Sequence, residues 1–261
     1  MTTLLVVVGV LGLAVGSFLN VVIHRVPRGE SVVRPGSRCP GCGAPIRARD
    51  NVPVLSWLAL RGRCAGCGAV ISVRYPLVEA GTAVLFVAVT ARLGLTAALP
   101  AYLYLAAVAV ALAVIDLDVR RLPNAIVLPS YLVAAALLAP AVLVRGDWSA
   151  AGRSLLAMSA LWTFYFVLTL LYPGGMGFGD VKLAGLLGLY LGWLGWSPVW
   201  FGTFAGFLLG GAAGGVLLLA RRVNRTTAIP FGPAMLAGAL LALFVATPIV
   251  SWYGSLTVPT T

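Results

Sequence analysis

Long uninterrupted apolar runs recur along this 261-residue chain and limit the folds open to it. A helix needs roughly 20 apolar residues to cross the hydrocarbon core of a bilayer. Charged residues make up 10% of the chain, against about 25% in a soluble domain. The sequence therefore predicts an all-α polytopic membrane protein with about eight transmembrane helices. The expected spans are 4–23, 77–95, 97–115, 126–144, 155–172, 181–195, 199–220 and 231–252.

Basic residues are distributed unevenly among the segments that join these spans. If the loop 24–76 is cytoplasmic, alternation places 15 of the 18 Lys and Arg residues on that side. Cytoplasmic loops of membrane proteins are enriched in Lys and Arg. We therefore expect the segments 116–125, 173–182 and 221–230 to be cytoplasmic too, and both ends of the chain to lie outside. This asymmetry accounts for the net charge of +11, so no nucleic-acid partner is predicted.

The predicted organisation has four parts. The first transmembrane helix, 1–23, is expected to be a retained anchor, because an Arg-rich loop follows it and no small-residue cleavage site does. A small cytoplasmic module, 24–76, comes next. Residues 77–254 form a seven-helix transmembrane domain, and 255–261 a short external tail.

All four cysteines lie in the loop 24–76, as two Cys-x-x-Cys pairs separated by 21 residues. Two such pairs bring four thiolates to one tetrahedral ion, as in zinc ribbons. A reducing cytoplasm argues against structural disulfides, and redox-active cysteines stay open as an alternative. Four thiolates leave no position for a catalytic water, so a structural Zn²⁺ is predicted. Its expected ligands are Cys39, Cys42, Cys64 and Cys67.

Three of the seven acidic residues lie near the ends of predicted spans, on one face of the membrane. Asp116 and Asp118 follow the third span, and Asp180 precedes the sixth. Ionisable groups at membrane depth are costly and are candidates for function. Two residues two positions apart point about 200° from each other on a helix, so only one can face a given partner. We choose Asp116, because Asp118 lies farther into water and beside Arg120 and Arg121.

The other four acidic residues are expected to have ordinary roles. Glu30, Asp50 and Asp147 lie in loops, where solvated charges are the default. Glu79 is expected in the first turn of a helix, where the helix dipole favours a negative charge. A role for Glu79 in a site beneath the cysteine module is the alternative.

A pair of carboxylates in a poorly solvated place supports peptide-bond hydrolysis. The two cannot both ionise at low cost, so they share one proton. The ionised carboxylate takes a proton from the attacking water, and the protonated one supports the oxyanion and the leaving amine. The glycines before Asp180 would let a substrate backbone approach closely. The candidate substrate-binding residues are Gly177, Gly179 and Lys182. The rival interpretation is a proton-coupled transporter whose two acids bind protons or cations.

An ordered set of motifs extends over nearly the whole chain. The motifs are GSFLNVVIHRVP at Gly16–Pro27, the two Cys pairs, RYPLVE at Arg74–Glu79, DLD at Asp116–Asp118, LPN at Leu122–Asn124, GFGDVK at Gly177–Lys182, and PFGP at Pro230–Pro233. In this set the chain resembles the prepilin peptidases, or type IV leader peptidases, of the kind that also methylates the new N-terminus. Asn124 stands where many relatives have Asp.

This resemblance implies a GxGD-type aspartic endopeptidase whose catalytic pair is Asp116 and Asp180. The implied substrates are type IV prepilins or type II secretion pseudopilins, cut after glycine at the cytoplasmic face of the bacterial inner membrane. The expected partners are these precursors and membrane lipid. The resemblance also implies N-methylation with S-adenosylmethionine in the N-terminal region, and a protease without methylation is the alternative. Candidate residues for the methyl-transfer region are Asn20, His24, Arg25 and Glu79.

Overall fold

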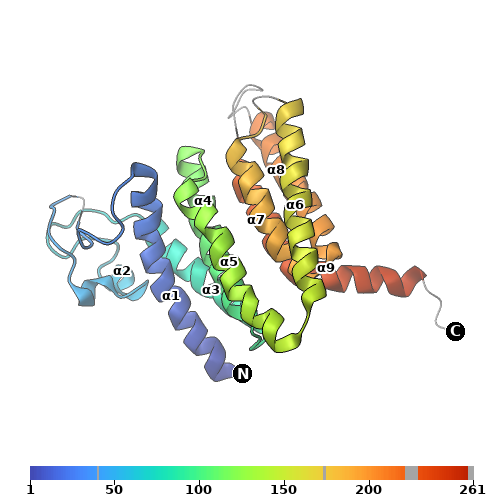
Figure 1. Ribbon diagram of the computed structural model, residues 1–261. Coiled ribbons are helices and arrows are strands. Elements are labelled where there is room, and N and C mark those ends of the chain that lie inside the picture. The colour runs from blue at the N-terminus through green and yellow to red at the C-terminus, as the bar shows by residue number, and fades with distance from the viewer. Residues whose placement is uncertain (40, 173–174, 221–228, 258–261) are drawn as a thin grey trace. The chain divides into compact units, whose positions relative to one another are not determined.

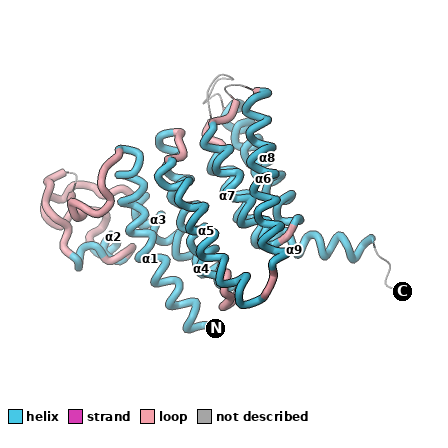
Figure 2. The backbone as a smooth tube through the Cα atoms, in the orientation of Figure 1, coloured by secondary structure: helices cyan, strands magenta, loops and turns pink. Residues whose placement is uncertain are grey.

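The computed structural model describes residues 1–39, 41–172, 175–220 and 229–257. These residues are mostly helical and include no strand (Figures 1 and 2). The α-helices are α1 (Thr2–Arg25), α2 (Leu55–Ala59), α3 (Arg74–Leu93), α4 (Leu99–Val119), α5 (Asn124–Arg145), α6 (Trp148–Leu171), α7 (Phe178–Leu194), α8 (Trp196–Leu219) and α9 (Gly232–Thr257). Single 3-10 turns lie at Val26–Arg28 and Ala48–Asn51.

The prediction of an all-α membrane protein is confirmed. Each of the eight predicted spans has one long helix in its place, and six of these helices are long and apolar enough to cross a bilayer: α1, α3, α4, α5, α6 and α8. Helix α7 has 17 residues, and the apolar part of α9 is Gly232–Ala246. Two predictions fall partly outside the described residues, namely the basic segment 221–230 with Arg221, Arg222 and Arg225, and the tail 255–261.

Two compact units make up the chain, Met1–Ala111 and Leu112–Thr261. In the N-terminal unit, α1 and α3 run antiparallel in close contact. A Cβ on Gly12 would lie 2.6 Å from the Cα of Ala83, and a Cβ on Gly16 would lie 2.7 Å from the Cα of Glu79. Small residues let helix backbones approach this closely in a membrane. The two helices therefore form a hairpin that carries the cysteine module between them.

Helix α7 is the central helix of the C-terminal unit and packs against α5, α6, α8 and α9 (Figure 1). Almost all of its residues from Asp180 to Gly192 are buried. Its contact with α6 depends on glycine, because a Cβ on Gly188 would lie 2.5 Å from the carbonyl oxygen of Ala157. Between Asp180 and Gly192, helix α7 is therefore covered by the neighbouring helices.

One expectation about an acidic residue is wrong. Helix α3 begins at Arg74, so Glu79 lies beyond its first turn. The Glu79 carboxylate is buried and accepts a hydrogen bond from the amide of Val54, at 2.7 Å. Asp147 is exposed in the loop before α6, as expected, and it also caps this helix by accepting a hydrogen bond from the Ala150 amide at 2.9 Å.

Candidate active site and metal centre

Asp116 is held at the end of α4 by the start of α9. The residue is 4% exposed, whereas Asp118, two positions on, is exposed. The Gly232 amide donates a hydrogen bond to Asp116 Oδ2 at 3.1 Å. The first amides of a helix have no partner within the helix and favour a negative charge. A Cβ on Gly232 would lie 2.7 Å from the same Oδ2, so only glycine fits this approach.

Asp180 is held in a similar way by the backbone that precedes α7. It lies in the first turn of this helix and is 8% exposed. Its Oδ2 accepts a hydrogen bond from the Gly177 amide at 3.1 Å, and its own amide donates to the Gly177 carbonyl at 3.0 Å. This reciprocal pair of bonds is a capping box, in which an acidic side chain satisfies a free amide at the helix start.

Leu122 links the surroundings of the two aspartates. A Cβ on Gly179 would lie 3.1 Å from the Cβ of Leu122, and a Cβ on Gly232 would lie 3.3 Å from its Cδ2. Leu122 therefore packs between the glycine beside Asp180 and the glycine that binds Asp116. The structure thus brings together, within the C-terminal unit, the pair chosen from the sequence.

An aromatic cluster lies beside this pair. Tyr165 of α6 is buried and stacks on Phe207 of α8, with ring centroids 5.5 Å apart. Phe231 lies 6.4 Å from Tyr165 and 5.3 Å from Phe207, and it directly precedes Gly232. Tyr165 could not be selected from the sequence, because a tyrosine within an apolar span carries no local signal of function.

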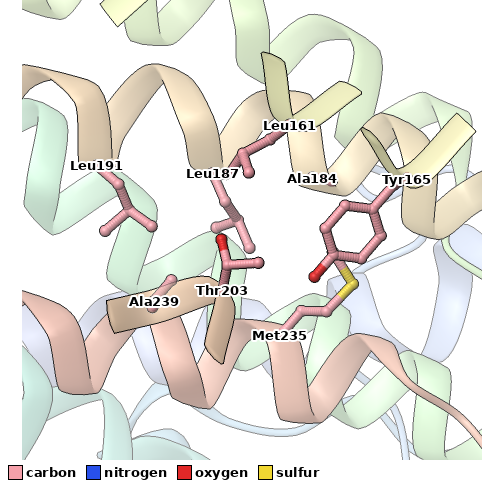
Figure 3. A pocket seen from close by; sticks show the side chains of 9 residues that line it. Leu161, Tyr165, Ala184, Leu187, Leu191, Thr203, Met235 and Ala239 are labelled. Atoms are coloured by element: carbon pink, nitrogen blue, oxygen red, sulfur yellow. The ribbon is translucent and has the colours of Figure 1, made fainter. Parts of the chain in front are cut away.

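The same tyrosine borders a small cavity among α6, α7, α8 and α9. Figure 3 shows Tyr165 facing Met235, with Leu187 and Thr203 nearby. The cavity has a volume of about 10 Å³, and its other lining residues are apolar or glycine. The Thr203 hydroxyl donates to the Val199 carbonyl at 2.8 Å. A space this small and apolar offers little to a polar ligand, so we place no binding site there.

Lys182 and the glycines of the GFGDVK motif have structural contacts of their own. The Lys182 ammonium donates to Asn124 Oδ1 at 2.9 Å and lies 4.9 Å from the ring centroid of Phe178. This contact joins the first turn of α7 to the start of α5. Leu122 fills the open side of Gly179, while Gly177 supplies the amide that binds Asp180.

The cysteine module has the geometry of a four-thiolate metal centre. The four sulfur atoms, of Cys39, Cys42, Cys64 and Cys67, all lie within 4.8 Å of one another. The Cys39 and Cys67 sulfurs are 3.8 Å apart. Zn–S bonds of about 2.3 Å in a tetrahedron place sulfurs about 3.8 Å apart, so the arrangement fits zinc.

The two Cys pairs share one backbone pattern that prepares the sulfurs for a cation. Gly43 donates to the Cys39 carbonyl at 2.8 Å, and Gly68 donates to the Cys64 carbonyl at 2.9 Å. Both glycines have a positive φ, near 70°, which other residues rarely adopt. Backbone amides of Cys42 and then Gly41 lower the pKa of Cys39 to about 6, whereas for Cys67 the lowering by the Ala69 amide is outweighed by the neighbouring thiols and burial, which raise its pKa to about 11. A thiolate is the form that binds metal.

The four candidates for the methyl-transfer region all belong to the N-terminal unit. The Asn20 side chain donates to the Tyr75 carbonyl at 3.2 Å, and Glu79 accepts from Val54. Arg25 donates to the Ser31 carbonyl at 3.0 Å. The His24 ring lies 3.2 Å from an Arg28 guanidinium nitrogen. These side chains connect α1, α3 and the module.

Comparisons with known proteins cover both units. Residues 10–93 match the model of the bacterial peptidase A24 N-terminal domain, and residues 103–219 match that of the type IV leader peptidase family. A Pseudomonas putida protein is 38% identical over 90% of this chain and 88% of its own length. An Aeromonas hydrophila protein is also 38% identical, over 92% and 90%. A Myxococcus xanthus protein is 44% identical over 70% and 55%.

All three of these relatives carry the name prepilin leader peptidase/N-methyltransferase. No solved structure matches the chain significantly.

Proposed function

Because the chain belongs to the type IV leader peptidase family, we propose that Asp116 and Asp180 hydrolyse the bond joining a basic leader to a type IV prepilin or pseudopilin. One observation carries this assignment. Two buried carboxylates from helices far apart in the sequence have surroundings that meet at Leu122 in one unit, and each is oriented by a glycine amide. The chain is thus a membrane peptidase with N-methyltransferase activity, and no finding supports a transporter.

The two carboxylates divide the hydrolytic work. One, ionised, removes a proton from a water molecule as its oxygen attacks the carbonyl carbon of the scissile bond. The other, protonated, donates a hydrogen bond to the carbonyl oxygen as negative charge develops there. When the tetrahedral intermediate collapses, the bond to nitrogen breaks and the amine leaves with a proton from the pair. The pair acts as one unit, so neither aspartate is assigned a fixed role.

Each aspartate accepts its backbone hydrogen bond through Oδ2. The Gly232 and Gly177 amides therefore fix the orientation of the carboxylates and leave Oδ1 for water and substrate. Gly177, Gly179 and Lys182 are proposed to line the path of the substrate backbone near α7.

Methyl transfer is proposed for the N-terminal unit. The new amino terminus would receive its methyl group from S-adenosylmethionine, whose sulfonium makes that methyl group electrophilic. Asn20, His24, Arg25 and Glu79 are proposed to shape this region. Because each already contacts another residue of its own unit, we assign none of them a direct contact with the donor. The zinc centre is proposed to hold the module folded, since a loop this small buries little core of its own.

The proposed location is the bacterial cytoplasmic membrane, with the aspartate pair and the cysteine module on the cytoplasmic side. The uneven distribution of Lys and Arg supports this orientation. A precursor with a basic leader would be held on the same side by the same preference.

Membranes containing the protein can be incubated with a short prepilin and a methyl donor labelled in its methyl group. Wild-type protein should cleave the precursor and label the product. Asp116→Asn and Asp180→Asn should each abolish cleavage yet still insert, and each should still label a pilin supplied already cleaved. Asp118→Asn is the matched control and should retain most activity, because its side chain is exposed. An inactive Asp118→Asn together with an active Asp116→Asn would show that the wrong aspartate was chosen.

A further inference from the structure

Helix α2 exposes two leucine side chains. Leu55 and Leu58 are 64% and 58% exposed and lie three positions apart, on one face of the helix. The opposite face is directed inward and carries Ser56 and Trp57. Ser56 is buried, accepts a hydrogen bond from the Val52 amide at 2.9 Å and donates one to the Arg49 carbonyl at 2.9 Å, while the Trp57 indole donates to the Ile71 carbonyl at 3.0 Å. Large apolar side chains on one face of a helix are ordinarily packed against a core, so the two leucines call for another apolar neighbour.

The level of α2 along the α1–α3 hairpin explains the exposure of these leucines. The Val54 amide, at the start of α2, donates to the Glu79 carboxylate, and Glu79 packs on Gly16. Gly16 lies nine residues before Arg25, which is about 14 Å along a helix axis. A helical side chain points toward the N-terminus of its own helix, and because α3 runs antiparallel to α1 this direction leads toward Arg25. The Glu79 carboxylate, and α2 with it, therefore lies closer than Gly16 to the level of Arg25.

Exposed apolar side chains of the hairpin occur at the same level. Phe18 of α1 and Leu77 of α3 are both exposed, one turn or less from Gly16 and Glu79 respectively. These two helices are long and apolar enough to span the membrane, so such side chains meet lipid. The outward face of α2 therefore lies at the same level along the hairpin as side chains that are placed to meet lipid.

Arginines flank α2 on both sides in the sequence. Arg47 and Arg49 come just before it and Arg61 and Arg63 just after it, and all four are exposed. The only acidic residue among positions 47–63 is Asp50, whose carboxylate lies 3.9 Å from Arg49 Nε. Exposed arginines next to a membrane attract anionic headgroups. The excess positive charge of residues 47–63 is complementary to an anionic lipid surface. It would repel another basic protein segment.

We propose that residues 47–63 form an interfacial anchor. Leu55 and Leu58 insert into the leaflet next to the cysteine module, and the four arginines bind the headgroups of anionic phospholipids. Helices with an apolar face and flanking basic residues bind membranes in this way, about 5–10 Å into the boundary region. The anchor thereby fixes the module against the membrane surface.

The test uses the full chain, reconstituted in vesicles of phosphatidylcholine and phosphatidylglycerol. The photo-crosslinking residue p-benzoylphenylalanine replaces Leu55 or Leu58, and replaces Val33 as the control. Val33 is 77% exposed and apolar, and it lies in the loop between α1 and the first Cys pair, outside residues 47–63. After illumination, mass spectrometry should find a phospholipid adduct at Leu55 and Leu58 and none at Val33. Crosslinks from these two positions only to the protein's own chain, or only to added prepilin, would overturn the proposal.

A second variant tests the headgroup contact. In vesicles with equal amounts of the two lipids, adducts at Leu58 should favour phosphatidylglycerol. Changing all four arginines to glutamine should bring the ratio of the two adducts close to one, while zinc content reports that the module is folded. An unchanged preference for phosphatidylglycerol would refute the role of the arginines.

Discussion

Asp116 owes its position to Gly232, a residue 116 positions further along the chain. The amide at the start of α9 is aimed at one oxygen of the carboxylate, and the missing side chain of Gly232 makes room for it. The PFGP motif is therefore part of the aspartate site through its backbone. Its role is to orient an acid that another helix supplies.

Replacing Gly232 by alanine should impair cleavage. The added methyl group would lie 2.7 Å from Asp116 Oδ2 and would displace the carboxylate. Misplacing a catalytic group by about 1 Å can cost on the order of 100-fold in rate, so we expect kcat to fall by 10- to 100-fold with little change in KM. Cleavage of a prepilin peptide in detergent measures both constants.

Gly215→Ala in α8 is the matched control, since no atom lies within 4 Å of the added Cβ. Methylation of a pre-cleaved pilin by Gly232→Ala should stay near the wild-type rate and would show that the protein is folded. A wild-type kcat for Gly232→Ala would refute the orienting role.

The acidic residues show which features of the site can be predicted from the local sequence and which cannot. Asp116 could be preferred to Asp118 because helical geometry and the apolar neighbours are visible in the sequence. The hydrogen-bond partner of Asp116 could not be predicted, because no residue near Gly232 indicates which carboxylate accepts a hydrogen bond from its amide. Glu79 was misjudged because its helix starts three residues earlier than predicted. Pro76 in that first turn was the available signal, since proline is favoured at helix starts.

Helix α7 carries Asp180 on a surface matched closely to α6. Gly188→Ala should destabilise this pairing, because its Cβ would lie 2.5 Å from the Ala157 carbonyl oxygen. Overpacking of this kind costs about 1–3 kcal/mol. Urea unfolding of the purified protein in detergent should show a lower midpoint, and cleavage should fall with it. Gly152→Ala, where the Cβ would have open space, should leave the midpoint unchanged; equal midpoints for both variants would contradict the packing argument.

The cysteine module should hold about one zinc per chain, because four thiolates suit one tetrahedral ion. Metal analysis of the purified protein measures the content, and Cys39→Ser and Cys64→Ser should both lower it. Chelation should reduce methylation and stability more than the cleavage step, since the module and the aspartates belong to different units. Disulfide-bonded cysteines in protein trapped directly from cells would rule out the metal centre.

The long helices were predictable because hydrophobic length is a strong local signal. The structure ends most of them within a few residues of the predicted bounds. Helix α2 was not predicted, since five residues are too few to show a periodic pattern. The fold of the Cys pairs was predictable from spacing alone. The contact of α2 with Glu79 was not, because it joins residues 25 positions apart through a backbone amide.

The orientation proposed for the whole protein rests on its basic residues and can be tested directly. In a variant without native cysteines, a single cysteine at Ser149 should react with an impermeant maleimide from outside. One at Ser72 or Ala125 should react only after the membrane is permeabilised. All three positions are exposed, so a lack of labelling reports the membrane barrier. The reverse pattern would place the aspartate pair on the outer face.

The short, buried helix α7 also bears on how the chain enters the membrane during synthesis. Its two charged residues, Asp180 and Lys182, each disfavour partitioning of an isolated helix from the translocon into lipid by up to about 3 kcal/mol. Its surface is covered by neighbouring helices, most extensively by α6, which is made just before it. We therefore expect helix α7 to remain in the translocon until it can enter the lipid together with α6. Biogenesis of the protease would then proceed by paired helices, and the aspartate would reach membrane depth already shielded from acyl chains.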